Sequence, residues 1–212
     1  MRRIIGLCAG LALMAMPALA DAPFAPPTPM VDSTLAKPGP KSVATGFTLD
    51  GMHGVLEKTR LADVAKHLGG HIAHEGDAST SLAWLCYDLP EQHLRVWLSA
   101  DEMHGGPGGA VNTVTIWTVS SPANSPQCPV IAGNPSIDVD GVSVGQAEAA
   151  VEARLGAPGL AKEGWTAYSH KAAQGGGFEE NDDLVVKIEA GRVGYLQASR
   201  LTSNRGLPRT ST

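Results

Sequence analysis

Apolar residues recur at helical spacing in two parts of the chain. In residues 57–68 the apolar positions fall at i, i+3, i+4 and i+7, which is one face of a helix: Leu61, Val64, Ala65 and Leu68. Gly69 follows, and glycine is a common residue at a helix C-terminus. Residues 144–155 show a similar apolar face; Ser143 is expected at the N-cap, and Gln146 follows three residues later, at the spacing of a capping box. The pattern therefore predicts two short amphipathic helices.

Each predicted helix is followed by segments in which apolar and polar residues alternate. This period of two is typical of antiparallel strands with one buried face. Strands are expected at residues 82–89, 93–100 and 112–119, and again near 165–168, 184–190 and 192–201. The aromatic pair Trp84 and Tyr87 in the first set has a counterpart in Trp165 and Tyr168 in the second. The same element types thus recur in the same order.

This order predicts an α+β fold made of two tandem repeats, each a helix packed on about three antiparallel strands. The first repeat is assigned to residues 42–132, the second to residues 133–202, and the last ten residues, 203–212, to a flexible tail. Each repeat is small, and its sheet needs cover on one face. The helix is expected to supply that cover. Whether the two sheets also join or pack together stays open.

The N-terminus has a different pattern. Residues 1–20 contain two arginines, an apolar run too short for a membrane span, and a small-residue ending, which predicts a secretory signal peptide cleaved after Ala20. The alternative is a membrane anchor. Residues 21–41 carry six prolines, which disfavour regular hydrogen bonding and predict an extended linker. The linker is a spacer or a ligand for a proline-reading groove.

Net charge narrows the choice of partners. The 16 Lys and Arg residues become 14 without Arg2 and Arg3, against 21 Asp and Glu, so the mature net charge is −7. Contacts with phosphate groups need clustered basic residues, so a nucleic-acid partner is disfavoured. No further apolar run is long enough for a membrane span, and a periplasmic or secreted location is expected.

Two cysteines remain after the signal peptide, Cys86 and Cys128. In an exported protein they are expected to form a disulfide, worth roughly 3–4 kcal/mol in the chain-entropy model. The alternative is a free nucleophile or a metal thiolate. Neither cysteine lies in a CxxC or CxH arrangement, which favours the disulfide.

The order of these elements resembles a known family. The sequence Val-x-x-x-Leu-Gly occurs at Val64–Gly69 and at Val151–Gly156, each time followed by a Trp/Tyr strand and a Leu-x-Val-x-Leu/Ile strand. This unit is similar to the repeat of β-lactamase inhibitory protein and to the small outer-membrane lipoprotein (SmpA/OmlA) domain. The resemblance implies a secreted or periplasmic binding module without catalytic residues. A mature chain that starts at Asp21 has no N-terminal cysteine to carry a lipid, which departs from the lipoproteins.

Candidate chemistry is sparse. His67, His71 and His74 lie close in sequence and are weak candidates for a metal site, because imidazole is a common zinc ligand. They lack an HExxH frame, and a helix break separates the first two. A run of acidic residues at 179–183 is interpreted as a solvated loop, with a calcium site as the alternative. No catalytic constellation and no cofactor are expected, and the chain is interpreted as a non-enzyme.

Two tryptophans are out of phase with the apolar stripe of their strands. Trp97 and Trp117 fall on the polar-leaning face, where large aromatics are common binding anchors. The alternative is that the linker or the other sheet covers them. The leading hypothesis is an exported protein-binding module, inhibitor-like or envelope-associated, that holds another exported protein on this face. The alternative hypothesis is a periplasmic metal- or small-ligand-binding protein that uses the histidine-rich end of the first repeat.

Overall fold

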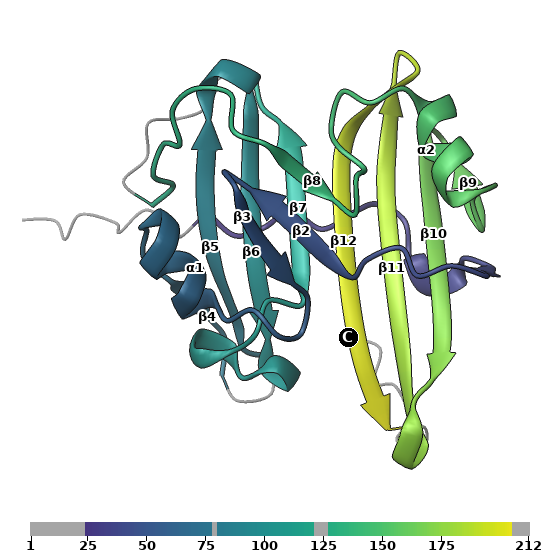
Figure 1. Cartoon of the computed structure of the whole chain (residues 1–212), viewed down its shortest axis with the longest axis horizontal. Helices are drawn as coiled ribbons and strands as arrows, with labels where there is room; N and C mark the ends of the chain where they lie inside the picture. The colour runs from purple at the N-terminus through teal and green to yellow at the C-terminus, as the bar shows by residue number, and fades with distance from the viewer. Residues whose placement is uncertain (1–23, 78–79, 121–126, 205–212) are drawn as a thin grey trace, which may run out of the picture.

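The structure is a computed structural model that describes residues 24–77, 80–120 and 127–204. Within these residues the chain forms two α-helices and twelve strands (Figure 1). The helices are α1 (Leu61–Leu68) and α2 (Glu148–Leu155). The strands are β1 (Pro38–Gly39), β2 (Gly46–Leu49), β3 (Met52–Val55), β4 (Ala73–Glu75), β5 (Leu82–Leu89), β6 (Leu94–Asp101), β7 (Thr113–Thr118), β8 (Ile137–Val139), β9 (Leu160–Lys162), β10 (Trp165–Ala173), β11 (Phe178–Glu189) and β12 (Arg192–Asn204).

Nine strands form one mixed sheet, the large sheet. Its order is β1-β10-β11-β12-β7-β6-β5-β4, with β9 also paired to β10, and within it only β1 runs parallel to its neighbour. The two halves of the chain meet where β12 pairs with β7, from Tyr195 opposite Trp117 to Ser199 opposite Thr113. The expected fold of two tandem helix-plus-sheet repeats is therefore wrong. Pairing β12 with β7 satisfies two strand edges that separate sheets would leave open.

A second sheet covers much of the large sheet on one side, the front face. This small sheet has the order β3-β2-β8, and Figure 1 shows it in front of the middle of the large sheet. Phe47 and Leu49 from β2 share one core with Leu85, Val96 and Leu196 from the large sheet. The expected cover by helices alone is incomplete, because two eight-residue helices are too short to span nine strands.

The two helices flank the small sheet (Figure 1). Helix α1 packs against β5 and β6 through Leu61 and Val64, and it ends at Gly69, whose φ is 78°. Helix α2 begins later than the capping-box spacing predicts, at Glu148. The Gln146 side chain does accept a hydrogen bond from the Ser143 N–H (3.1 Å), but this contact forms a turn ahead of the helix.

The proline-rich segment is part of the fold. Residues 24–39, here called the N-terminal strap, cross the opposite side of the large sheet, the back face, where Ala36 packs against Ala167 and Val185. The strap ends in β1, which adds a parallel strand at Ser169 and His170 of β10. The segment expected to be an extended linker is thus packed against the sheet over the residues that the structure describes. It covers part of the back face, as the alternative for the two tryptophans proposed.

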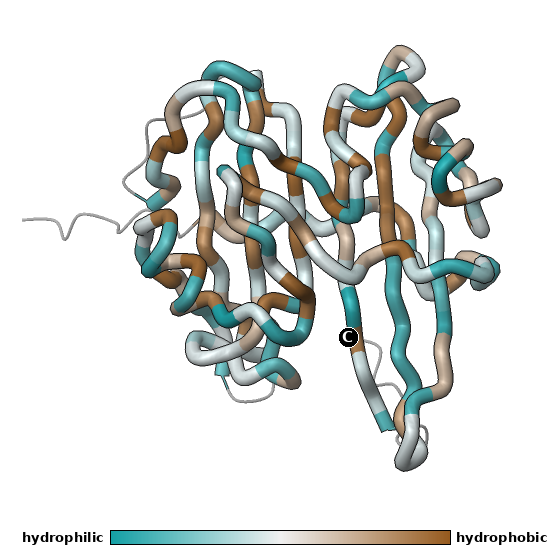
Figure 2. The backbone as a smooth tube through the Cα atoms, viewed as in Figure 1, coloured by the Kyte–Doolittle hydropathy of each residue, from teal (hydrophilic) through white to brown (hydrophobic). Residues whose placement is uncertain are grey.

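The hydropathy of the residues differs between two regions of the large sheet (Figure 2). Apolar positions gather where the sheet faces the small sheet and the helices, whereas the far ends of β10, β11 and β12 are hydrophilic. The predicted signal peptide lies outside the described residues, as does most of the predicted tail. No helix in the described part of the chain is long and apolar enough to cross a membrane.

Candidate functional site

The back face carries the predicted disulfide. The Sγ atoms of Cys86 and Cys128 lie 1.96 Å apart and close a loop with a sequence separation of 42 residues. The two cysteines pack with Trp84 and Trp97 in a cluster of their own, separate from the main core. The bond therefore fastens the segment after β7 to β5 on this face.

The two candidate tryptophans differ in their surroundings. Trp97 is 3% exposed, and its indole N–H donates a hydrogen bond to the Phe24 carbonyl oxygen of the strap (3.1 Å). Trp117 is 44% exposed. Of the two alternatives, cover by the linker holds for Trp97 and an open surface holds for Trp117.

Trp117 belongs to a row of residues in register across four strands. Tyr195 on β12 lies opposite Trp117, Lys187 on β11 opposite Tyr195, and Trp165 on β10 opposite Lys187. The Trp117 and Tyr195 ring centroids are 6.3 Å apart at 76°, and those of Trp165 and Tyr195 are 5.3 Å apart at 69°. The Lys187 ammonium lies 5.3 Å from the Trp165 ring, a favourable cation–π distance. We call these four residues the aromatic row.

The edge-to-face geometry limits what the aromatic row can bind. Coplanar rings would offer a flat platform for stacking, but the interplanar angles of 76° and 69° turn neighbouring rings on edge. Edge-to-face rings are typical of packed protein aromatics. The row therefore suits an irregular apolar partner better than a flat stacked ligand.

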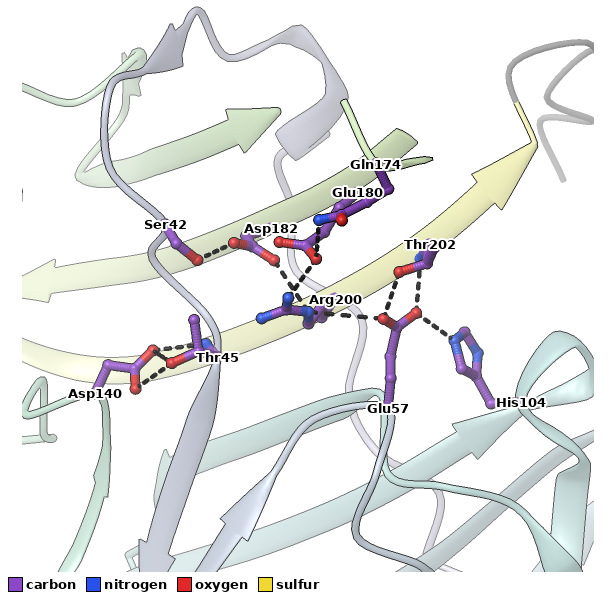
Figure 3. Close-up of polar contacts among 10 residues, drawn as sticks. All are labelled: Ser42, Thr45, Glu57, His104, Asp140, Gln174, Glu180, Asp182, Arg200 and Thr202. Carbon is purple, nitrogen blue, oxygen red and sulfur yellow. Dashed lines mark hydrogen bonds and ion pairs between the residues drawn. The ribbon is translucent and has the colours of Figure 1, made fainter. Parts of the chain in front are cut away.

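Ionic side chains gather on the front side of the sheet, where Glu57 follows β3 (Figure 3). The Glu57 carboxylate accepts hydrogen bonds from the backbone N–H and the hydroxyl of Thr202, both 2.6 Å, and from the His104 imidazole at 2.9 Å. The Arg200 guanidinium Nε is 3.6 Å from the same carboxylate. Burial alone would raise the pKa of Glu57, but these hydrogen bonds outweigh it and lower the pKa from 4.5 to about 2.

His104 lies between two carboxylates. Its Nδ1 is 2.5 Å from Asp101 Oδ1, and its Nε2 is 2.9 Å from Glu57 Oε1. Burial lowers the pKa of the imidazole, but hydrogen bonds and charges from both partners outweigh burial and raise the pKa from 6.5 to about 9. A Cβ at Gly109 would lie 2.1 Å from the His104 carbonyl oxygen, so the close turn after His104 requires glycine at position 109.

Arg200 is the second cation of the front network. Its guanidinium forms an ion pair with Glu180, and its Nε lies 3.7 Å from Asp182 Oδ1. Asp182 is fully buried, and burial raises its pKa despite the Ser42 hydroxyl and the Arg200 charge, which lower it. The acidic run at 179–183 is therefore not a solvated loop: it lies on β11, where Glu180 and Asp182 face Arg200.

An open groove of about 570 Å³ runs beside this network. Its walls are Leu56, Glu57, Lys58, Gln174, Gly175, Phe178, Glu180, Arg200 and Thr202. Both nitrogens of His104 are bonded to carboxylates, so the imidazole has no free lone pair to act as a general base. Glu57 likewise makes four hydrogen-bonding and ionic contacts within the network. The network therefore joins β12 to the first half of the chain.

The three weak metal candidates do not come together. His67 and His71 are exposed and lie on either side of the positive-φ residue Gly69. His74 Nε2 is instead 2.9 Å from the Ser81 hydroxyl. In the part of the chain that the structure describes, no group of three or more His, Cys, Asp or Glu side chains is arranged to hold a metal ion.

Three comparisons with known proteins assign this chain to no family. A scan against family models, a search of curated proteins and a search of solved structures each found no match. The resemblance to β-lactamase inhibitory protein and the lipoprotein domain thus stays a prediction, and the site is interpreted from its own geometry.

Several residues of these sites carried no signal in the sequence. Tyr195 lies in a predicted strand, but its neighbours Trp117 and Trp165 belong to strands distant in sequence. The partners Glu57 and Arg200 are 143 positions apart in number and meet only because β12 crosses the middle of the large sheet. The aromatic spacing at Trp165 and Tyr168 was visible, but it identified a strand and not a surface.

Proposed function

We propose that this chain is an exported, non-enzymatic binding module that holds a partner protein on the back face of its large sheet, with Trp117 as the anchor. The observation that carries the proposal is the 44% exposure of Trp117 within the aromatic row. A large aromatic side chain that is partly open and supported by a second ring is typical of an interface anchor.

The exposed apolar residues of the strap also favour the back face as the interaction site. Phe24, Met30 and Leu35 on the strap are 40%, 83% and 72% exposed. Single exposed apolar residues are common on protein surfaces, but several on one face favour an interaction site. The strap crosses the face that carries Trp117, and the Tyr195 hydroxyl donates a hydrogen bond to the Pro27 carbonyl oxygen (3.3 Å). Export is supported by the predicted signal peptide and by the disulfide.

The test compares two matched variants in a crosslinking capture from the native cell envelope. Trp117→Ala removes the anchor, and Val55→Ala removes an equally exposed apolar side chain, also 44%, from β3 of the small sheet. Each variant is made in the chain that starts at Asp21. The proposal expects one partner that is captured by the wild type and by Val55→Ala and is lost with Trp117→Ala. Truncation of a hot-spot aromatic costs ~2 kcal/mol or more, which is about thirtyfold in affinity.

Mapping of the crosslinks gives an independent result. Crosslinks on β7, β12 or the strap support the proposal. Crosslinks confined to the front groove, around Lys58 and Gln174, or a partner that Trp117→Ala still captures at wild-type level, would refute it.

A further inference from the structure

The strap is held by two hydrogen bonds that are three residues apart. The Trp97 indole N–H donates to the Phe24 carbonyl oxygen (3.1 Å), and the Tyr195 hydroxyl donates to the Pro27 carbonyl oxygen (3.3 Å). A polyproline II helix has three residues per turn, so its carbonyls at i and i+3 point to the same side. The two donors on the sheet thus match one turn of that helix.

The side chains of the strap follow the same arrangement. Pro26, Pro27 and Pro29 are half-buried against the back face, whereas Thr28 and Met30 are exposed. Prolines restrict φ to the value that polyproline II requires and provide no N–H for strand pairing. This part of the strap therefore docks through carbonyl oxygens and ring faces.

The Arg95 side chain lies at one end of this surface, against the first residue of the strap. The Arg95 guanidinium lies 4.6 Å from the Phe24 ring and 5.9 Å from the Trp97 ring. Arg95 is itself fixed by Asp88, with its Nε 2.6 Å and its Nη2 3.0 Å from the two carboxylate oxygens. The Phe24 backbone N–H donates to the Gln127 side-chain oxygen (3.0 Å). Phe24, three positions before Pro27, thus packs against a guanidinium that Asp88 holds in place.

We propose that Trp97, Tyr195 and Arg95 form a polyproline-binding groove, that the strap occupies it in cis, and that the partner offers a proline-rich segment that replaces the strap. This inference rests on the proposed function and names the chemistry of the partner. Aromatic grooves whose Trp and Tyr side chains donate to ligand carbonyls are a recurring way to bind such segments. Trp97 and Tyr195 are 3% and 4% exposed. A replacement that left their donors unpaired would be costly, so it must offer two acceptors at the same spacing.

Because the strap occupies the groove, it competes with any ligand that binds there in trans. A segment tethered by a short flexible link has an effective concentration in the millimolar range. A partner segment must therefore bind more tightly than the strap, or bind when the strap is loosened. Trp117 lies beside Tyr195 and remains exposed, so it is free to contact the partner protein while the strap still occupies the groove.

The experiment uses the full mature chain and a labelled peptide with the sequence of residues 24–31, measured by fluorescence polarisation. The strap is loosened by Pro26→Gly together with Pro27→Gly, which keeps both carbonyls and removes the preference for polyproline II. We expect this variant to bind the peptide at least about tenfold more tightly than the wild type, because the competing segment is weakened. A peptide with its three prolines replaced by alanine is the ligand control and is expected to bind about tenfold more weakly.

Two donor variants in the loosened chain locate the site. Trp97→Phe removes the indole N–H, and Tyr195→Phe removes only the hydroxyl and keeps the ring, so a folding defect in the first does not end the test. Each is expected to weaken peptide binding about fivefold to tenfold, the usual effect of one lost hydrogen bond. Val55→Ala, on β3 of the small sheet on the other side of the molecule, is the control and is expected to leave peptide binding unchanged.

Three results would overturn the proposal. They are the absence of peptide binding to the loosened chain up to about 1 mM, equal binding of the proline and alanine peptides, and equal losses in the two donor variants and Val55→Ala. The outcomes also separate the two proposals. If Trp117→Ala loses partner capture but the loosened chain binds no peptide, the binding module is supported and the polyproline groove is refuted. If the loosened chain binds the peptide but Trp117→Ala still captures the partner, the groove is supported and the role of Trp117 as the anchor is refuted.

Discussion

His104 makes the stability of the fold depend on pH. The pKa of its imidazole is raised from 6.5 to about 9 by Asp101 and Glu57, so the folded chain keeps a proton that the unfolded chain loses. The resulting stabilisation is fully present below pH 6.5 and is lost as the pH rises through about 9. This interval corresponds to ~3 kcal/mol at about 1.4 kcal/mol per pKa unit. The side chain is 9% exposed, so solvent screening removes little of it.

The change that tests this reasoning is His104→Gln, which keeps hydrogen-bonding groups and removes the titration. Urea denaturation of the disulfide-intact chain, followed by tryptophan fluorescence between pH 6 and pH 9, gives the free energy of unfolding at each pH. We expect the wild type to lose ~3 kcal/mol more than the variant over this range, with the variant already less stable at pH 6. His67→Gln, an exposed histidine on α1, is the control and should follow the wild type.

The outcome that refutes the reasoning is specific. If wild type and His104→Gln lose stability in parallel between pH 6 and pH 9, the imidazole is not held as a cation by its two carboxylates. A parallel loss with a lower stability of the variant at all pH values would show that His104 stabilises the fold without titrating in this range.

Three further predictions concern stability. Arg200→Gln should cost about 3–5 kcal/mol in urea denaturation, because it leaves buried carboxylates without their cation; a cost under ~1 kcal/mol would contradict the network. Replacing both Cys86 and Cys128 by Ser should cost about 3–4 kcal/mol, and unchanged denaturation would show that the disulfide is dispensable. Gly54→Ala should cost about 1–3 kcal/mol and lower the melting temperature, because the new Cβ would meet the Phe47 ring at 2.1 Å; an unchanged melt would mean that the ring moves away freely.

Several local elements could be predicted from the sequence. Strand β5 occupies the predicted residues 82–89, and β6, β7 and β12 lie within a few residues of their predicted bounds. Side-chain alternation depends only on neighbours along the chain, so a short window is enough to identify it. The disulfide partners also followed from the small number of cysteines in a chain expected to be exported.

The predicted helices were too long, because tertiary contacts use the residues at their N-termini. Both lose residues at their N-termini, where α1 begins at Leu61 and α2 at Glu148. The residues ahead of α1 are used elsewhere: the Glu57 backbone N–H donates to the Val111 carbonyl oxygen (2.7 Å). Tertiary hydrogen bonds outweigh a weak helix propensity.

The sequence by itself determined β5, β6, β7, β10, β11 and β12 in outline, the break after α1 and the cysteine pair, because these follow from the period of the side chains, the backbone freedom of glycine and the number of cysteines. The other six strands in the described part of the chain were not predicted. Only the tertiary structure decided that β12 joins β7, that a small sheet covers the front face, and that the strap covers Trp97 but not Trp117. Alternation shows that a strand has a buried face, yet it carries no information on which edge pairs with a neighbour or on what covers the other face; β6, which alternates, is buried on both faces. The network of Glu57, His104 and Arg200 depends on the same long-range association, since charged residues distant in sequence have no local pattern that marks them as partners.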